Sequence, residues 1–197
     1  MIDKYGAGQA PYCFPGTHVL RNRLGLKSDH ALMAAEQALT AIAAAGIELR
    51  PPPYDMAYLQ AIHHRLFEDL YGWAGEVRSV DISKDATRFF VVHRIEAEAS
   101  KLFARLAAQR WLCDMPRETL IASAAEFFGD LSMIHPFREG NGRAQRIFFQ
   151  HVLANAGYAT NWWAVQADEW REANIAAVVC DYAALTKVFK RCISEAI

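Results

Sequence analysis

The chain has 197 residues, 53% of them hydrophobic, and a formal net charge of −1 at pH 7. This length and composition predict a single globular domain over residues 1–197 with a sizeable core. The balanced charge argues against binding to nucleic acid or to a membrane surface through bulk charge. Charged residues break the apolar stretches before a membrane span is reached, and the first residues lack the pattern of a signal peptide. Four cysteines without metal-type spacing further predict reduced thiols in a cytoplasmic protein.

The first part of the chain has an irregular segment followed by two helical patterns. Residues 1–27 are punctuated by glycine and proline and are expected to be mostly irregular. Ser28 or Asp29 can cap a helix that runs through an alanine-rich stretch to about Gly46. Asp55 can cap a second helix, whose apolar residues are spaced to form one buried face. Those residues are Leu59, Ile62, Leu66 and Leu70.

A change of pattern between residues 77 and 93 predicts the one convincing hairpin of the chain. Val80 and Ile82 alternate with polar residues, and the sequence Lys84-Asp85-Ala86 is typical of a turn. Residues 89–92 are β-prone. We call this expected hairpin the flap.

The remainder of the chain is helical in pattern. Helices are expected at about residues 96–109, 117–133, 143–155, 167–180 and 182–194. With the two earlier helices, they predict a mainly α-helical bundle of about six to eight helices with one β-hairpin. Trp162, Trp163 and Trp170 are expected to pack between helices.

The most informative stretch runs from His135 to Arg146 and reads as a loop that leads into a helix. Gly140 and Gly142 allow the backbone to turn sharply, so that successive N–H groups can face one point, as phosphate binding requires. Asn141 between them tolerates left-handed geometry and can donate its own amide. No G-x-x-x-x-G-K-[ST] motif occurs in the chain, which excludes a P-loop.

The charged residues of the same stretch supply the remaining parts of a site. Arg143 and Arg146 are three residues apart, hence on one helix face, and arginine suits bidentate contact with phosphate. Glu139 offers the hard oxygen ligand that Mg²⁺ requires. His135 has the side chain best suited to accept a proton at neutral pH. Each residue alone has an ordinary structural explanation, but their conjunction predicts transfer of a phosphorus-containing group.

A second group of polar residues leaves an alternative open. His63 and His64 are adjacent, and Glu68 follows His64 by one helical turn, so the pair could hold a metal. No third ligand is evident from the sequence, and a polar helix edge explains the residues more simply. A metal-dependent hydrolase that uses these side chains with His135 remains an alternative function.

The stretch His135-Pro136-Phe137-x-Glu139-Gly140-Asn141-Gly142-Arg143-x-x-Arg146 matches the HPFx(D/E)GNGRxxR signature of the Fic family at each defining position. Residues 12–25 and residues 73–82 also resemble segments of bacterial stand-alone, toxin-type (class I) members of that family. The resemblance covers the whole chain as a single Fic domain. It implies the Fic fold, with residues 135–146 as the Fic loop and residues 77–93 as the flap.

The resemblance implies transfer of AMP from ATP to a hydroxyl side chain of a target protein. His135 would be the base, and Glu139 would hold Mg²⁺. The nucleotide would be bound by Arg138, Gly140, Asn141, Gly142, Arg143 and Arg146. Trp170 and Asn174 lie in the region where Fic proteins approach the adenine. The target would dock along the flap, at Val80, Ile82, Lys84 and Asp85.

The resemblance also implies a protein partner. Many Fic proteins carry a helix with a (Ser/Thr)-x-x-x-Glu-(Gly/Asn) motif, whose glutamate pairs with the second arginine of the signature, here Arg146. No glutamate of this chain has Ser or Thr four residues earlier, which indicates a toxin that a separate small antitoxin restrains. By the same resemblance, a candidate target is a type II topoisomerase, DNA gyrase or topoisomerase IV. A Fic-fold binding module without catalysis is a further alternative, and the intact motif argues against it.

Overall fold

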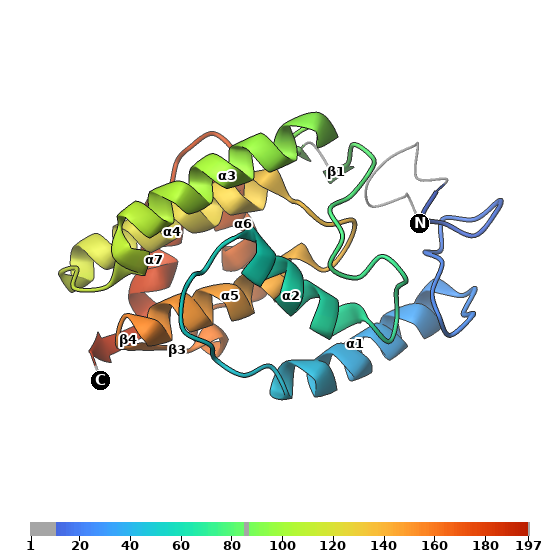
Figure 1. Cartoon of the computed structure of the whole chain (residues 1–197), viewed down its shortest axis with the longest axis horizontal. Helices are drawn as coiled ribbons and strands as arrows, with labels where there is room; N and C mark the ends of the chain where they lie inside the picture. The colour runs from blue at the N-terminus through green and yellow to red at the C-terminus, as the bar shows by residue number, and fades with distance from the viewer. Residues whose placement is uncertain (1–10, 85–86, 197) are drawn as a thin grey trace.

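The computed structural model describes residues 11–84 and 87–196, which form a mainly helical fold (Figure 1). Seven α-helices lie in this part of the chain, as the sequence predicts. They are α1 (Asp29–Ala45), α2 (Met56–Phe67), α3 (Val92–Ala108), α4 (Arg117–Ile134), α5 (Asn141–Asn155), α6 (Ala167–Ala177) and α7 (Ala183–Cys192). None of the helices in the described ranges is long and apolar enough to cross a membrane. All four cysteines are free thiols.

The first two helices begin where the sequence predicts. The side chain of Ser28 accepts a hydrogen bond from the Ala31 N–H, and that of Asp55 accepts one from the Tyr58 N–H. These caps satisfy donors that a helix N-terminus leaves unpaired. The expected apolar residues of the second helix are all buried, although Leu70 lies just beyond its end.

The core is built around α4 and α5, which pack against each other in the middle of the molecule (Figure 1). Phe127 and Phe128 of α4 meet Phe148 and Phe149 of α5, with 4.9 Å between the ring centroids of Phe128 and Phe149. Aromatic side chains bury large apolar areas, so this cluster fixes the two helices relative to each other. The loop that joins them, residues 135–140, is therefore held at both ends by the core.

The flap is shorter than the sequence predicts. Its strands are only β1 (Ser83–Lys84) and β2 (Thr87–Arg88), which pair antiparallel. The expected turn residue Asp85 lies outside the described residues. Residues 89–91 form no strand, and α3 already begins at Val92 rather than at residue 96.

The end of the chain also differs from the prediction. The helical pattern at residues 182–194 gives α7 only as far as Cys192, and β4 (Ile193–Ala196) follows and pairs with β3 (Tyr158–Thr160). Arg117, at the start of α4, donates to the carbonyl oxygens of Ile193 at 2.8 Å and Ser194 at 3.1 Å. These contacts hold the segment extended, so the prediction of a helix to residue 194 is wrong. The pairing of β3 with β4 joins strands that α6 and α7 separate in the chain, so it is not a second hairpin.

Two of the three tryptophans pack as expected. Trp162, in the short 3-10 helix Trp162–Ala164, lies edge-on to Phe189 with 5.8 Å between ring centroids. Trp170 of α6 lies 5.8 Å from Trp162 by the same measure. Trp163 is 95% exposed, so the prediction that it packs between helices is wrong.

Candidate active site

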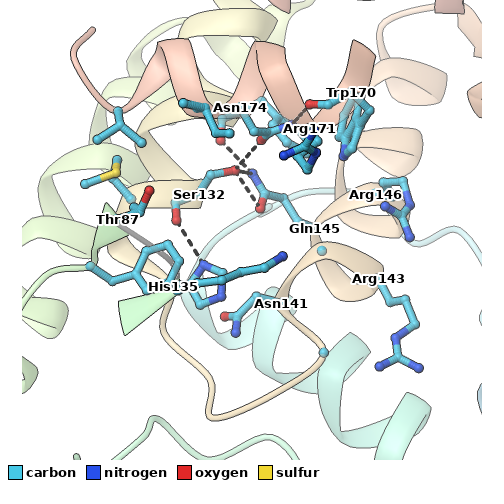
Figure 2. Close-up of a pocket in the computed structure, with 18 of the residues that line it drawn as sticks. Thr87, Ser132, His135, Asn141, Arg143, Gln145, Arg146, Trp170, Arg171 and Asn174 are labelled. Carbon is cyan, nitrogen blue, oxygen red and sulfur yellow. Dashed lines mark hydrogen bonds between the residues drawn. The ribbon is translucent and has the colours of Figure 1, made fainter. Parts of the chain in front are cut away.

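A pocket of about 430 Å³ lies between the flap, the loop 135–140, α5 and α6. Figure 2 shows side chains that converge on it from these elements. Thr87 comes from the flap, His135 from the loop, Asn141 and Arg146 from α5, and Trp170 from α6. The fold therefore brings most of the predicted motif to one concave surface.

His135 lines this pocket in a strained backbone conformation. It ends α4 with a φ of 47°, in the left-handed region, which costs a non-glycine residue about 1–2 kcal/mol. Its Nδ1 donates to the carbonyl oxygen of Ser132 at 3.0 Å (Figure 2), which makes Nε2 the unprotonated nitrogen of the neutral ring. Phe89 stacks on the imidazole with 3.7 Å between ring centroids. These contacts orient the ring as a proton acceptor.

The side chain of Asn141 closes the loop that follows. Its Oδ1 accepts a hydrogen bond from the Phe137 N–H at 2.9 Å, and its Nδ2 donates to the Phe137 carbonyl at 2.8 Å. Asn141 was expected to donate to phosphate, but the structure gives its amide a part in shaping the loop. Gly140 has a φ of 79°, and a Cβ added there would lie 2.2 Å from Cζ of Phe67. Only glycine fits this position.

The N-terminus of α5 presents unpaired donors at the pocket. The backbone N–H groups of Asn141 and Gly142 have no protein acceptor within residues 11–84 and 87–196. Both residues line the pocket. Such N–H groups, together with the helix dipole, make a helix N-terminus a site for anions.

The two arginines of α5 differ in their partners. Arg143 forms an ion pair with Glu36 of α1 and donates to the Thr40 hydroxyl at 3.3 Å. Both arginines line the pocket, but Arg146 has no ion pair or hydrogen bond with any described residue. Burial and the neighbouring charge of Arg143 both lower the pKa of Arg146. Because both effects disfavour its positive charge, an anion bound beside Arg146 would relieve them.

Glu139 lines the pocket, and its Oε1 accepts a hydrogen bond from the Gly140 N–H at 3.0 Å. A carboxylate beside the N-terminus of α5 could hold Mg²⁺, which usually takes one or two carboxylates plus substrate phosphates. Arg138, expected among the nucleotide-binding residues, does not line the pocket. Its side chain is buried, with the guanidinium carbon 5.9 Å from the centre of the Tyr12 ring. The geometry thus gives the Arg138 side chain a packing role.

Arg78 had no assigned role in the sequence, yet it ties the base of the flap to the loop. Its Nε donates to the His135 carbonyl at 2.9 Å and its Nη1 to the Val80 carbonyl at 2.7 Å. Its Nη2 donates to the Phe90 carbonyl, and its backbone N–H donates to the Pro136 carbonyl at 2.8 Å. Burial lowers its pKa to about 10, so the side chain stays charged at neutral pH. Its sequence neighbours mix polar and apolar residues and gave no signal of this role.

His63 and His64 do not form the metal site considered above. His63 is fully buried, and both of its ring nitrogens have backbone partners. His64 is exposed, with Nδ1 3.5 Å from a carboxylate oxygen of Glu68. The part of the chain that the structure describes contains no group of three or more His, Cys, Asp or Glu side chains that could hold a metal ion. The hydrolase alternative therefore loses its ligand set.

The two residues expected near the adenine both line the pocket from α6 (Figure 2). Trp170 packs edge-on to Phe128, with 5.0 Å between ring centroids. Asn174 donates from Nδ2 to the Trp170 carbonyl at 2.8 Å and accepts at Oδ1 from the Ser132 hydroxyl at 3.3 Å. Together they form an aromatic and polar wall opposite the helix N-terminus.

The flap residues expected to dock a target divide into buried and exposed groups. Ile82 is buried, and its carbonyl accepts from the Phe89 N–H at 3.3 Å. Val80 packs against the core, and its carbonyl accepts a hydrogen bond from Arg78. Lys84 is exposed and lines the pocket, whereas Asp85 lies outside the described residues. The strand edges of this region are therefore confined to β1 and β2.

Comparison with known proteins gives relatives over the whole chain. Residues 53–153 match the Fic/DOC family. A probable protein adenylyltransferase Fic from Salmonella typhimurium is 39% identical over 196 residues, which cover 100% of this chain and 98% of that protein. A protein of the same name from Escherichia coli K12 is 36% identical, with the same coverage.

A solved structure extends the likeness to three dimensions. The N-terminal Fic domain of a VirB-translocated Bep effector protein from Bartonella quintana, solved with bound ADP, has a TM-score of 0.87 and 29% identity, and the match covers 95% of this chain and 96% of that one. The matched family region includes His63, Arg78 and the complete motif from His135 to Arg146. The fold, the pocket and the sequence relatives agree, and the chain belongs to the Fic/DOC family.

Proposed function

We propose that this protein is a protein adenylyltransferase that transfers AMP from ATP to a hydroxyl side chain of a target protein. One observation carries the proposal: an oriented imidazole, that of His135, shares a pocket with two N–H groups of α5 and the guanidinium of Arg146. None of these donors has an acceptor among the residues that the structure describes. The names of the Salmonella and Escherichia relatives, and the ADP in the Bartonella structure, support it.

In the proposed reaction, the target hydroxyl oxygen attacks the α-phosphorus of ATP. The bond from that phosphorus to the bridging β-phosphate oxygen breaks, and pyrophosphate leaves. Nε2 of His135 takes the hydroxyl proton. The N–H groups of Asn141 and Gly142 donate to phosphate oxygens and stabilise the charge that develops there, and Arg146 pairs with the terminal phosphates. Glu139 would hold Mg²⁺, which neutralises phosphate charge when bound.

The second candidate function is a binding module that holds ATP without transferring AMP. A pure binding site needs the anion-binding groups but has no use for an oriented base. The hydrogen bond from His135 to Ser132 and the stacking of Phe89 on its ring therefore favour the transferase.

The test is incubation of the purified protein with bacterial lysate, Mg²⁺ and ATP labelled at either the α- or the γ-phosphate. We expect label in a target protein from α-labelled ATP only. His135→Ala should lower the rate by about 10²–10⁴ while ATP still binds in calorimetry, since removal of a general base costs about that much. Transfer of γ-label would indicate a kinase, and ATP binding without transfer would favour the binding module.

We further propose that the target docks as an extended segment along the flap. Main-chain hydrogen bonds at an exposed strand edge are a common way to hold such a segment. The support is positional, since Lys84 and Thr87 belong to the two short strands and also line the pocket. A segment paired there would place its side chains at the site of transfer.

The pocket also supports restraint by a separate protein. A glutamate from a partner helix could pair with Arg146 and compete with the γ-phosphate through the same charge-assisted contact. Among the described residues, Glu36 forms an ion pair with an arginine of the motif, but that arginine is Arg143 and not Arg146. We therefore propose a cytoplasmic toxin held by a small antitoxin, with a type II topoisomerase as the first target to test.

The toxin proposal is tested by expression of this chain alone beside its His135→Ala form. We expect growth arrest from the wild type only, and labelling of purified gyrase or topoisomerase IV subunits by the wild-type protein. Equal growth of both strains, with slow modification by the purified protein and no partner removed, would contradict it.

A further inference from the structure

His63 of α2 lies outside the pocket and connects the loop at residues 135–140 to Gly75, just before the flap. The Gly75 N–H donates to its Nδ1 at 2.9 Å, and its Nε2 lies 2.9 Å from the carbonyl oxygen of Glu139. A backbone N–H can only donate and a carbonyl oxygen can only accept, so Nδ1 is unprotonated and Nε2 carries the hydrogen. The ring is a neutral bridge with an acceptor at one end and a donor at the other.

Aromatic neighbours fix the orientation of this imidazole. It stacks on Phe137 with 3.9 Å between ring centroids and 19° between planes, and it lies 4.7 Å from Phe67. Phe137 belongs to the loop, and Phe67 fills the space that a Cβ on Gly140 would occupy. Movement of the loop would therefore break the hydrogen bond and the ring stack together.

The other end of the bridge is equally well anchored. Gly75 has a φ of 83°, and a Cβ added there would lie 2.9 Å from Cβ of His64, so only glycine lets the backbone come this close to α2. Gln60 of the same helix donates to the Gly75 carbonyl at 3.0 Å. Residues of α2 thus hold both polar backbone groups of Gly75. This fixes the end of the bridge opposite the loop.

We propose that His63 is a positioning residue, which fixes the backbone of Glu139 and the N–H donors that follow it. The inference rests on the proposed function of that loop. Without the bridge, the Glu139 carbonyl loses the hydrogen bond from His63, and the loop can rotate about its glycines. The carboxylate and the N–H groups then leave the geometry that ATP requires. Residues that orient a ligand-binding group from behind typically contribute about 10–100-fold to affinity or activity.

The test compares His63→Phe with His64→Phe. The first variant keeps a flat ring in the aromatic stack but removes both hydrogen bonds, and the second makes the same change at the exposed neighbouring residue. For folded His63→Phe, we expect the Mg²⁺ concentration at half-maximal AMP transfer to rise about tenfold or more. Amide hydrogen exchange at Phe137 and Gly140, whose N–H groups donate within the loop, should be faster in the nucleotide-free variant than in the nucleotide-free wild type. His64→Phe should match the wild type in both measurements.

Rescue variants separate positioning from packing. The amide of His63→Gln can donate where Nε2 does and should recover part of both effects, whereas the shorter His63→Asn reaches Gly75 only. If His63→Phe does not fold, the Gln and Asn variants are compared directly, and we expect the Gln variant to protect the loop better. Equal behaviour of these two, or of the two Phe variants, would overturn the inference.

A further outcome would assign His63 a purely structural part. In that case His63→Phe would unfold at a lower temperature, with loop exchange and Mg²⁺ dependence unchanged in the folded protein. The proposed function fails differently, through a wild-type protein that binds ATP and transfers no AMP. The exchange measurements on the nucleotide-free protein would still test the bridge.

Discussion

The two arginines of α5 share a helix face but have different neighbours, and this difference predicts their roles. Arg146 has no partner among the described residues, so Arg146→Ala should leave stability almost unchanged. It should weaken ATP binding by about 1.5–3 kcal/mol, the usual size of a charged hydrogen bond. Arg143→Ala removes the ion-pair partner of Glu36, whose carboxylate then keeps only the hydrogen bond from Tyr71 among the described residues. This variant should instead lower the free energy of unfolding by about 1–3 kcal/mol. Calorimetric titration with ATP and urea unfolding measure the two effects.

Glu36→Gln is the control for this division of roles. It keeps the shape of the side chain but removes the charge that holds Arg143, so stability should fall without loss of ATP affinity. If Arg143→Ala weakened ATP binding as much as Arg146→Ala, the ion pair with Glu36 would have to open when the nucleotide binds.

Gly140 is the loop position where a side chain is least tolerable. Gly140→Ala would place a methyl group against Phe67 and keep a positive φ, so it should destabilise the protein by about 2–5 kcal/mol. Gly142→Ala is the matched control, because φ there is not positive and the nearest atom to its Cβ is Nη1 of Arg146 at 3.8 Å. Thermal unfolding of the two variants decides the comparison, and equal melting temperatures would contradict the steric argument.

Among the elements, the flap depends most on a single side chain outside it. Arg78→Met would leave the carbonyl groups of His135, Val80 and Phe90 without their donor. Each buried unpaired group costs about 1–3 kcal/mol, so the free energy of unfolding should fall by about 3 kcal/mol or more. Arg88→Met, at an exposed position of β2, is the control and should change little. A similar small effect of both substitutions in urea unfolding would show that the flap base is held by other contacts.

The docking proposal predicts an effect of the backbone of β1. The Phe89 N–H donates to the Ile82 carbonyl. In the antiparallel pattern the backbone groups of Lys84 therefore face Thr87, and those of Ser83 face the free edge. Ser83→Pro removes an edge N–H and should reduce modification of a protein target while ATP affinity stays the same. Ser83→Ala keeps that N–H and separates the backbone effect from the loss of the side chain. The measurement is the rate of AMP transfer to the target beside calorimetric ATP binding. Full target modification by the proline variant would exclude strand pairing at β1.

Whether an element could be predicted from the sequence depends on how far apart its interacting residues lie along the chain. The loop and the caps at Ser28 and Asp55 could be predicted because their determinants lie within a few residues of each other. The alternation at Val80 and Ile82 indicated a long hairpin, but it reflects burial beside Arg78, whose partners lie far along the chain. The two-residue period of the alternation could not distinguish a long hairpin from burial beside Arg78.

The same reason explains the residues that the sequence did not reveal. Ile193 and Ser194 continue the helical pattern, and their extended form depends on contacts with Arg117, distant in the sequence. The part played by His63 depends on Gly75 and Glu139, which lie on different segments. Its neighbour His64 and the carboxylate of Glu68 suggested a metal pair only because they are close in the sequence.

For the whole molecule, the loop at residues 135–140 is part of the core. It joins α4 to α5, whose aromatic residues form the centre of the fold, and it is tied to α2 and to the base of the flap. The strain at His135 persists because these surroundings determine its conformation. Stability and activity should therefore be lost together when the surroundings of the loop are altered.

The cations at the mouth of the pocket have a kinetic consequence. Four cationic side chains line it, those of Lys84, Arg143, Arg146 and Arg171, and Glu139 is the one carboxylate among its described lining residues. The chain as a whole nevertheless has a net charge of −1. The local field therefore has the opposite sign to the global one, and at cellular ionic strength it is screened beyond about 8 Å. The association rate constant of ATP should fall as salt rises, while the dissociation rate constant changes little. Stopped-flow measurements with a fluorescent ATP analogue would show this, and the speed of nucleotide capture would then depend on the pocket mouth rather than on overall charge.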